Sequence, residues 1–103
     1  MPEKPEWTKD WPKVEGTIPG SKGKEIIERD HKILSPSYTR SEPLVGEEGW
    51  GPYIRDPDEN VFLDLSSGMF VQNYGYSNPY ITEEVKNMLD TLTHFAGTHY
   101  YHE

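Results

Sequence analysis

The sequence predicts an α+β chain in which an extended N-terminal arm and a short helix precede a small antiparallel sheet and an amphipathic helix. Three observations support this prediction. Prolines interrupt the first 20 residues, apolar and polar residues alternate between turn sequences at 43–67, and apolar residues recur at helical spacing at 81–92. We expect two parts, an arm at 1–20 and a folded segment at 21–103.

The composition leaves little material for a closed core. Leu, Ile, Val and Phe account for 20 of the 103 residues, and the formal net charge is −8, which brings the chain near the border where autonomous folding fails. The acidic balance disfavours nucleic acid and membranes as partners, because phosphate contacts need clustered Lys and Arg. The absence of cysteine excludes disulfides and thiolate metal sites. No segment has the apolar length of a membrane span or signal core, so we expect a cytoplasmic location.

The arm is expected to be extended and mobile, because its prolines block helix interiors and sheet ladders. These prolines are Pro2, Pro5, Pro12 and Pro19. Two large aromatic residues, Trp7 and Trp11, are expected to lie on a surface of this chain or of a partner.

A short helix is predicted from Ser21 onward. Ile26, Ile27 and Leu34 stand among charged residues and give the helix one apolar edge. Ser21 is expected near its N-cap, and Pro36 is expected to end it.

Two or three short antiparallel strands are predicted next. The candidates are PLVGEE at 43–48, GPYIRD at 51–56 and the alternating VFLDLSS at 61–67. The linking PDEN at 57–60 has turn composition, with Pro fixing φ and Asp or Asn able to bond its own backbone.

The clearest element is an amphipathic helix with Asn78 as N-cap and Pro79 as its first residue. Its apolar stripe consists of Ile81, Val85, Met88, Leu89 and Leu92. The small sheet offers only part of the surface that this stripe needs. The aromatic segment after the helix lacks the composition of a natural tail, so we expect polypeptide to follow residue 103.

No catalytic or metal-binding constellation is predicted. Three histidines lie near the end of the chain, at His94, His99 and His102. Their spacing puts at most two on one helical face, which favours an aromatic, polar surface segment over a metal site. The seven lysines lie in the arm or on polar helix faces, so none is expected to be desolvated enough to form a Schiff base.

Two further clusters favour structural interpretations. Asp56, Asp58 and Glu59 crowd one turn without the EF-hand arrangement, so we expect a solvated turn rather than a calcium site. Gly49 and Gly51 precede a strand rather than a helix, so we expect flexible residues at a strand entry rather than a phosphate loop.

Residues 14 to 103 together resemble the opening of class III aminotransferases, closest to archaeal-type 4-aminobutyrate and ornithine-like members. The resemblance rests on the order and spacing of GSKGKEIIERDHK, SPSYTR, the Asp-rich turn leading to VFLDLSSGMFV, and the Gly75 to Pro79 segment that opens the long helix.

The resemblance implies a fold-type I enzyme that uses pyridoxal 5'-phosphate and is usually a homodimer. In this family the region supplies an N-terminal helix, a small antiparallel sheet of the minor domain, and a helix leading to the large domain. The implied activity transfers an amino group from an ω- or α-amino acid, of the 4-aminobutyrate or ornithine type, to a 2-oxo acid. The catalytic lysine, the carboxylate partner of the pyridinium and the phosphate loop lie further along, so the resemblance implies a truncated chain that is inactive alone and binds no cofactor by itself.

What carries over is part of the substrate pocket. The resemblance places Met69 in the wall, with Gly68 allowing close backbone approach and Phe70 beside it. It places Tyr38 and Arg40 near the pocket mouth.

Three positions depart from the family pattern. Tyr76 and Asn78 stand where relatives commonly have the two histidines of G-H-x-H-P. Asn60 stands where the turn usually has Gly, and Asn tolerates the left-handed geometry expected there.

Three alternatives stay open from the sequence. The chain could be a non-catalytic binding module that docks on a full-length aminotransferase through its apolar helix and Trp-bearing arm. It could belong to a pyridoxal-phosphate-dependent amino-acid racemase built on the same scaffold. It could also be a free-standing acidic interaction domain whose similarity is accidental.

Overall fold

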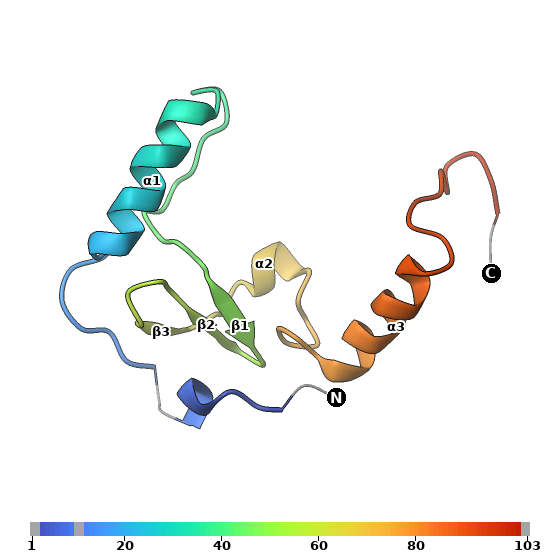
Figure 1. Cartoon of the computed structure of the whole chain (residues 1–103), viewed down its shortest axis with the longest axis horizontal. Coiled ribbons are helices and arrows are strands. Elements are labelled where there is room, and N and C mark those ends of the chain that lie inside the picture. Colours follow the sequence, from blue (N-terminus) through green and yellow to red (C-terminus); the bar gives the residue numbers. More distant parts are fainter. Residues whose placement is uncertain (1–2, 10–11, 102–103) are drawn as a thin grey trace.

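The computed structural model describes residues 3–9 and 12–101, and it contains the elements of the predicted α+β chain in the expected order (Figure 1). They are a 3-10 helix η1 (Glu6–Lys9), α1 (Ser21–Ile33), β1 (Glu48–Trp50), β2 (Tyr53–Arg55), β3 (Val61–Leu63), the short α2 (Ser67–Phe70) and α3 (Pro79–Leu89). The strands form one antiparallel sheet in the order β1-β2-β3, which confirms the predicted meander.

The chain is open, with α1 and α3 extending away from the sheet in different directions (Figure 1). Its radius of gyration is 16.8 Å, against about 13 Å for a compact domain of about 100 residues. Val61 is the one buried aliphatic or aromatic residue in the part that the structure describes. No helix within that part has the length and apolar character needed to cross a membrane.

The central strand of the sheet is β2, and the Gly51 turn joins it to β1. β1 pairs with β2 from Trp50↔Tyr53 outward, and β2 pairs with β3 through Ile54↔Phe62. The first strand begins at Glu48, so the prediction of a strand over 43–48 was wrong in its bounds: the tight turn sets the register, and beyond β1 the pairing continues through the hydrogen bond from Glu47 N to Arg55 O at 2.9 Å. The expectation that Gly49 is a flexible entry residue was also wrong, because Gly49 is paired within β1.

The arm pairs with the sheet through Lys13. Lys13 exchanges two backbone hydrogen bonds with Val61, at 2.9 and 2.8 Å, and so covers part of the free edge of β3. Trp7 lies half-buried in η1, a turn that the proline pattern did not predict. Trp11 lies outside the described residues.

Helix α1 begins at Ser21, but its N-cap is Gly20, which has no side chain to cap the helix, and the Ser21 side chain does not cap it either. Instead, the carboxylate of Asp58 accepts hydrogen bonds from the backbone N–H groups of Lys22 at 3.0 Å and Gly23 at 2.8 Å. The predicted Ser cap was wrong because a side chain from the β2–β3 turn already satisfies the free amides. The helix ends at Ile33, before Pro36, as predicted.

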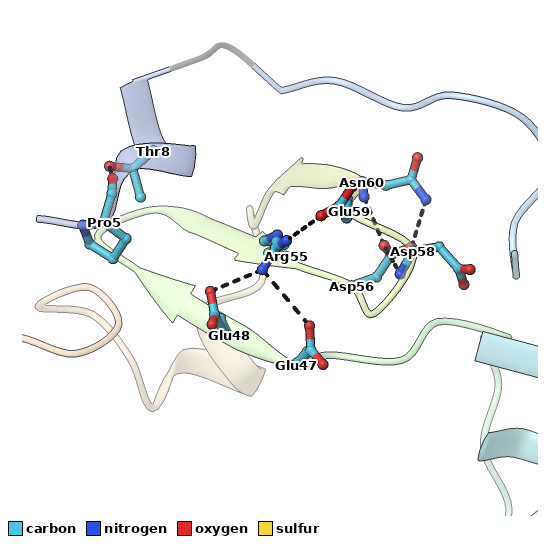
Figure 2. Close-up of polar contacts among 9 residues, drawn as sticks. All are labelled: Pro5, Thr8, Glu47, Glu48, Arg55, Asp56, Asp58, Glu59 and Asn60. Carbon is cyan, nitrogen blue, oxygen red and sulfur yellow. Dashed lines mark hydrogen bonds and ion pairs between the residues drawn. The ribbon is translucent and has the colours of Figure 1, made fainter. Parts of the chain in front are cut away.

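The turn between β2 and β3 is held by buried polar side chains (Figure 2). Asp56 and Asn60 are each 3% exposed. Asp56 Oδ1 accepts from the backbone N–H groups of Asp58 at 2.9 Å and Asn60 at 2.8 Å, and Oδ2 accepts from Asn60 Nδ2 at 2.8 Å. The expected solvated turn was wrong at these positions, because the two side chains satisfy each other and can be buried together.

Left-handed geometry falls one residue earlier than predicted. Glu59 has a φ of 71°, whereas Asn60 is absent from the positive-φ residues of the described chain. Asn60 instead uses its side chain, and its Oδ1 accepts from the backbone N–H of Glu15 at 2.8 Å. The residue therefore joins the turn to the arm.

Helix α3 follows its predicted boundaries closely. Pro79 is its first residue, and Asn78 Oδ1 accepts from the backbone N–H groups of Tyr80 at 3.1 Å and Ile81 at 3.5 Å. The apolar stripe is open to solvent in this chain, since all five residues from Ile81 to Leu92 that form it are exposed.

Candidate functional site

The candidate site is centred on α2, which is a left-handed turn. Its four residues Ser67, Gly68, Met69 and Phe70 have φ values of 53°, 59°, 59° and 68°. The turn is closed by hydrogen bonds from Phe70 N to Ser66 O and from Val71 N to Ser67 O, both 2.9 Å. Left-handed helical geometry costs roughly 1–2 kcal/mol per L-residue, so the surroundings must stabilise this turn.

The turn presents its side chains to solvent. Met69 is 84% exposed and Phe70 is 81% exposed in this chain. Gly68 has room for a Cβ, but its φ of 59° favours glycine. The three residues that the resemblance placed at the substrate pocket therefore lie side by side on one protruding turn.

Asp64 anchors the start of this turn. Its Oδ1 accepts hydrogen bonds from Ser66 N at 2.7 Å, Ser66 Oγ at 3.0 Å and Ser67 N at 3.1 Å. Its Oδ2 accepts from the Tyr76 hydroxyl at 2.5 Å. The hydroxyl and then the Ser66 donors hold the pKa of the Asp64 carboxyl below its usual range, although partial burial opposes them.

Tyr76 reaches Asp64 from the segment that follows the turn. Its backbone exchanges two hydrogen bonds with Gly51, at 2.8 and 2.9 Å. Its ring lies directly on β1, because a Cβ added at Gly49 would be 2.7 Å from Tyr76 Cγ. The hydrogen bond to Asp64 and then burial raise the pKa of the Tyr76 hydroxyl to about 12, so it remains a donor at neutral pH.

Tyr38 and Arg40 lie in a different part of the chain. The Arg40 guanidinium stacks over the Tyr38 ring at 4.7 Å and forms an ion pair with Asp30 of α1 at 2.8 Å. Arg40 lines a groove beside α1, whereas Ser67 lines the hollow between the Gly51 turn and Tyr76. The described chain therefore brings Gly68, Met69 and Phe70 together but places Arg40 at a separate groove, with Tyr38 against the Arg40 guanidinium.

Sequence reasoning missed two residues of this site. Asp64 was not singled out, although the string D-L-S-S at 64–67 is typical of an Asp that bonds the backbone two residues on. Tyr76 was noted only as a departure from the family pattern. Its contact with Asp64 spans 12 residues, and no local pattern predicts it.

The described residues do not form a site for pyridoxal phosphate. All seven lysines are exposed, so none is desolvated as a Schiff-base lysine must be. Helix N-termini commonly hold phosphate, but Asp58 occupies that of α1 and Asn78 occupies that of α3. No group of three or more His, Cys, Asp or Glu side chains that could hold a metal ion occurs among residues 3–9 and 12–101, and His102 lies outside them.

Comparison with known proteins identifies relatives. No protein-family profile matches the chain. The chain is 32% identical over 74 residues to an acetylornithine aminotransferase of Archaeoglobus fulgidus, which covers 72% of this chain and 20% of the relative. The structure superposes on the ornithine δ-aminotransferase of Plasmodium falciparum with a TM-score of 0.67 and 18% identity, over 79% of this chain and 20% of that one.

The homologues of this chain are class III aminotransferases of the acetylornithine and ornithine type. The chain is also 37% identical over 86 residues to an alanine/serine racemase of Pyrococcus horikoshii, covering 82% of this chain and 18% of the racemase. It thus spans about a fifth of the length of the curated relatives it matches. The α+β meander with its flanking helices is the part of the aminotransferase fold that this chain contains.

Proposed function

We propose that this chain is the N-terminal part of a pyridoxal-phosphate-dependent aminotransferase that moves an amino group from an ω- or α-amino acid to a 2-oxo acid. The observation that carries the proposal is the similarity to several acetylornithine and ornithine aminotransferases over more than two thirds of this chain. The complete enzyme would act as a homodimer, and a cytoplasmic location stays a prediction of the sequence.

In the complete enzyme this chain would form part of the wall of the substrate pocket and would not supply the reacting groups. The left-handed turn would present Met69 to the substrate, with Gly68 allowing close approach and Phe70 beside them. Tyr38 and Arg40 would lie at the mouth of the pocket. The lysine and the phosphate cradle would come from polypeptide outside these 103 residues, which agrees with the exposure of every lysine here.

A racemase is the second candidate, because this chain is 37% identical to the alanine/serine racemase and 32% identical to the Archaeoglobus fulgidus aminotransferase. Aminotransferases and racemases of this kind share a cofactor and differ in what happens after the substrate loses its proton. A third interpretation, a binding module that docks on a full-length aminotransferase through α3, follows from the exposed apolar stripe.

A pair of chimeras tests these candidates. The segment of the Archaeoglobus fulgidus aminotransferase that matches this chain is replaced by residues 14–103, and the same replacement is made in the Pyrococcus horikoshii racemase. Both products are assayed for amino transfer to a 2-oxo acid and for racemisation of alanine and serine. We expect the aminotransferase chimera to transfer amino groups. If that chimera folds and binds cofactor but is inactive while the racemase chimera racemises, the racemase candidate replaces it.

The isolated chain provides a separate check. Mixed with pyridoxal phosphate, it should show no visible absorbance band that depends on one particular lysine, because all seven lysines are exposed and none is singled out by desolvation. A band that disappears when one particular lysine is changed to Arg would contradict the claim that this chain contributes only to the wall of the pocket.

A further inference from the structure

The left-handed turn Ser67–Phe70 raises the question of what keeps it in an unfavourable conformation. Ser67, Met69 and Phe70 are not glycine, and positive φ is unfavourable for each of them. No apolar core supports the turn, because Leu65, Met69 and Phe70 are all more than four-fifths exposed. The stabilisation must therefore come from polar contacts at its base.

Those contacts converge on one carboxylate. Asp64 Oδ1 accepts the three bonds that start the turn, and Oδ2 accepts a bond from the Tyr76 hydroxyl at 2.5 Å. A charge-assisted O–H···O⁻ bond of this length belongs to the strong class. Without the hydroxyl, the Asp64 carboxylate could rotate about its last torsion. Its hydrogen bonds to Ser66 and Ser67 would then be replaced by hydrogen bonds to water.

Tyr76 is itself fixed independently of the turn. Its backbone is bridged to Gly51, its ring rests on the Gly49 backbone, and Ser77 Oγ donates to Gly49 O at 2.7 Å. Gly49 and Gly51 belong to β1 and the turn that follows it, so the sheet orients the hydroxyl. The chain of contacts thus runs from the sheet to Tyr76, to Asp64 and then to the turn.

We propose that Tyr76 is a positioning residue whose hydroxyl, through Asp64, locks the left-handed turn that presents Met69 to the substrate. This inference rests on the proposed function for the role of Met69 at the pocket. The tyrosine stands where the resemblance expects a histidine, and the two differ in how they titrate. Imidazole changes charge near neutral pH, whereas the Tyr76 hydroxyl keeps its proton until far above it.

The coupling is tested on the 103-residue chain with Tyr76→Phe, which keeps the ring on β1 and removes the hydroxyl. Tyr74→Phe is the matched control, because that ring is 80% exposed and the hydroxyl that bonds Asp64 belongs to Tyr76. In Tyr76→Phe we expect amide hydrogen exchange of Val71 and Gln72, which both donate to Ser67 O, to accelerate on the order of tenfold. Exchange at Gly23 of α1 should not change in either variant.

A second readout separates positioning from general stability. In the wild-type chain the methyl resonance of Met69 should shift with the Tyr76 titration near pH 12, while that of Met88 in α3 should not. Asp64→Asn should move the Tyr76 titration back toward 10 and should loosen the turn as Tyr76→Phe does. Equal exchange rates in Tyr76→Phe and wild type, or a Met69 methyl that ignores the tyrosine titration, would overturn the proposal.

The functional consequence is measured in the aminotransferase chimera. Tyr76→Phe should raise the KM for the amino donor on the order of tenfold with a smaller change in kcat, because a displaced wall weakens binding more than chemistry. An equal fall in kcat with unchanged KM would contradict the positioning role. If the parent chimera is inactive, the proposed function fails, whereas the coupling of Tyr76 to the turn is still decided on the chain itself.

Discussion

Asp58 caps a helix that lies far from it in sequence: its Oδ2 accepts a hydrogen bond from the backbone N–H of Gly23, 35 residues earlier, at 2.8 Å. The contact fixes α1 to the β2–β3 turn. It also explains the glycine at position 20, where an added Cβ would lie 2.3 Å from Asp58 Cγ. A carboxylate is favoured at this place because the N-terminal end of a helix carries partial positive charge.

The cap predicts an acid-sensitive helix. The amides of Gly23 and then Lys22 lower the pKa of Asp58 below its usual 3.8. A depressed folded-state pKa gives stability that is present above the unfolded value and is lost as the pH falls through the folded value. We expect the helical circular dichroism of α1 to decrease below about pH 3.8. Asp58→Asn should weaken the helix already at neutral pH, whereas Glu28→Gln, which removes a charge from the exposed face of α1, should not.

Gly49→Ala should displace the Tyr76 ring. The new Cβ would lie 2.7 Å from Tyr76 Cγ, and the ring is held by the Gly51 bridge, so it cannot simply swing away. Overpacking of this kind costs about 1–3 kcal/mol, which urea titration of the unfolding free energy can detect. Gly97→Ala is the control, since a Cβ there meets nothing within 4 Å. Equal midpoints for the two variants would show that the ring does not lie on β1.

Asn60→Gly should destabilise the chain even though the family resemblance expects Gly there. The substitution removes the Nδ2 donor from buried Asp56 and the Oδ1 acceptor from Glu15 N. Leaving a buried carboxylate oxygen unsatisfied costs about 1–3 kcal/mol. Thermal melting should therefore show a lower midpoint. A rise in the midpoint would mean that glycine's backbone freedom outweighs the side-chain bonds, and that the turn strains Asn60.

Asn78→Ala should fray the start of α3. The side chain accepts from the amides of Tyr80 and Ile81, and losing such a cap typically costs about 1 kcal/mol. Amide exchange at those two positions should accelerate. Asn87→Ala lies later on the same helix, has no cap role and provides the comparison. If both variants exchange alike, Pro79 alone sets the helix start.

The predictable parts of this fold are those determined by short-range chemistry. Asn78 followed by Pro79 predicted the start of α3, and the Pro and Asp of the 57–60 turn predicted the β2–β3 connection. The errors occurred where a distant side chain replaced a local one. Ser21 was expected to cap α1, but Asp58 of the β2–β3 turn caps the helix instead. A local sequence pattern cannot predict a contact between residues so far apart in the chain.

The candidate site also has one part that the sequence predicted and one part that it did not. The family resemblance led to the Gly68, Met69 and Phe70 segment, but nothing in the string predicted that its backbone would turn left-handed at non-glycine residues. That geometry depends on Asp64 and on Tyr76, which meet across 12 residues. A pairing of this length is set by the tertiary arrangement of the sheet rather than by neighbouring residues.

The burial of Val61 alone among the aliphatic and aromatic residues of the described chain has a thermodynamic consequence. Unfolding would hydrate less new hydrocarbon than in a compact domain, and hydrocarbon hydration dominates the heat-capacity increment, about 1.2–1.5 kcal/mol/K for an ordinary domain of this length. The isolated chain should have a smaller increment, and its stability should vary with temperature along a shallower curve. Calorimetry would then record a broad, weak endotherm, and acid would be a more effective denaturant than cold.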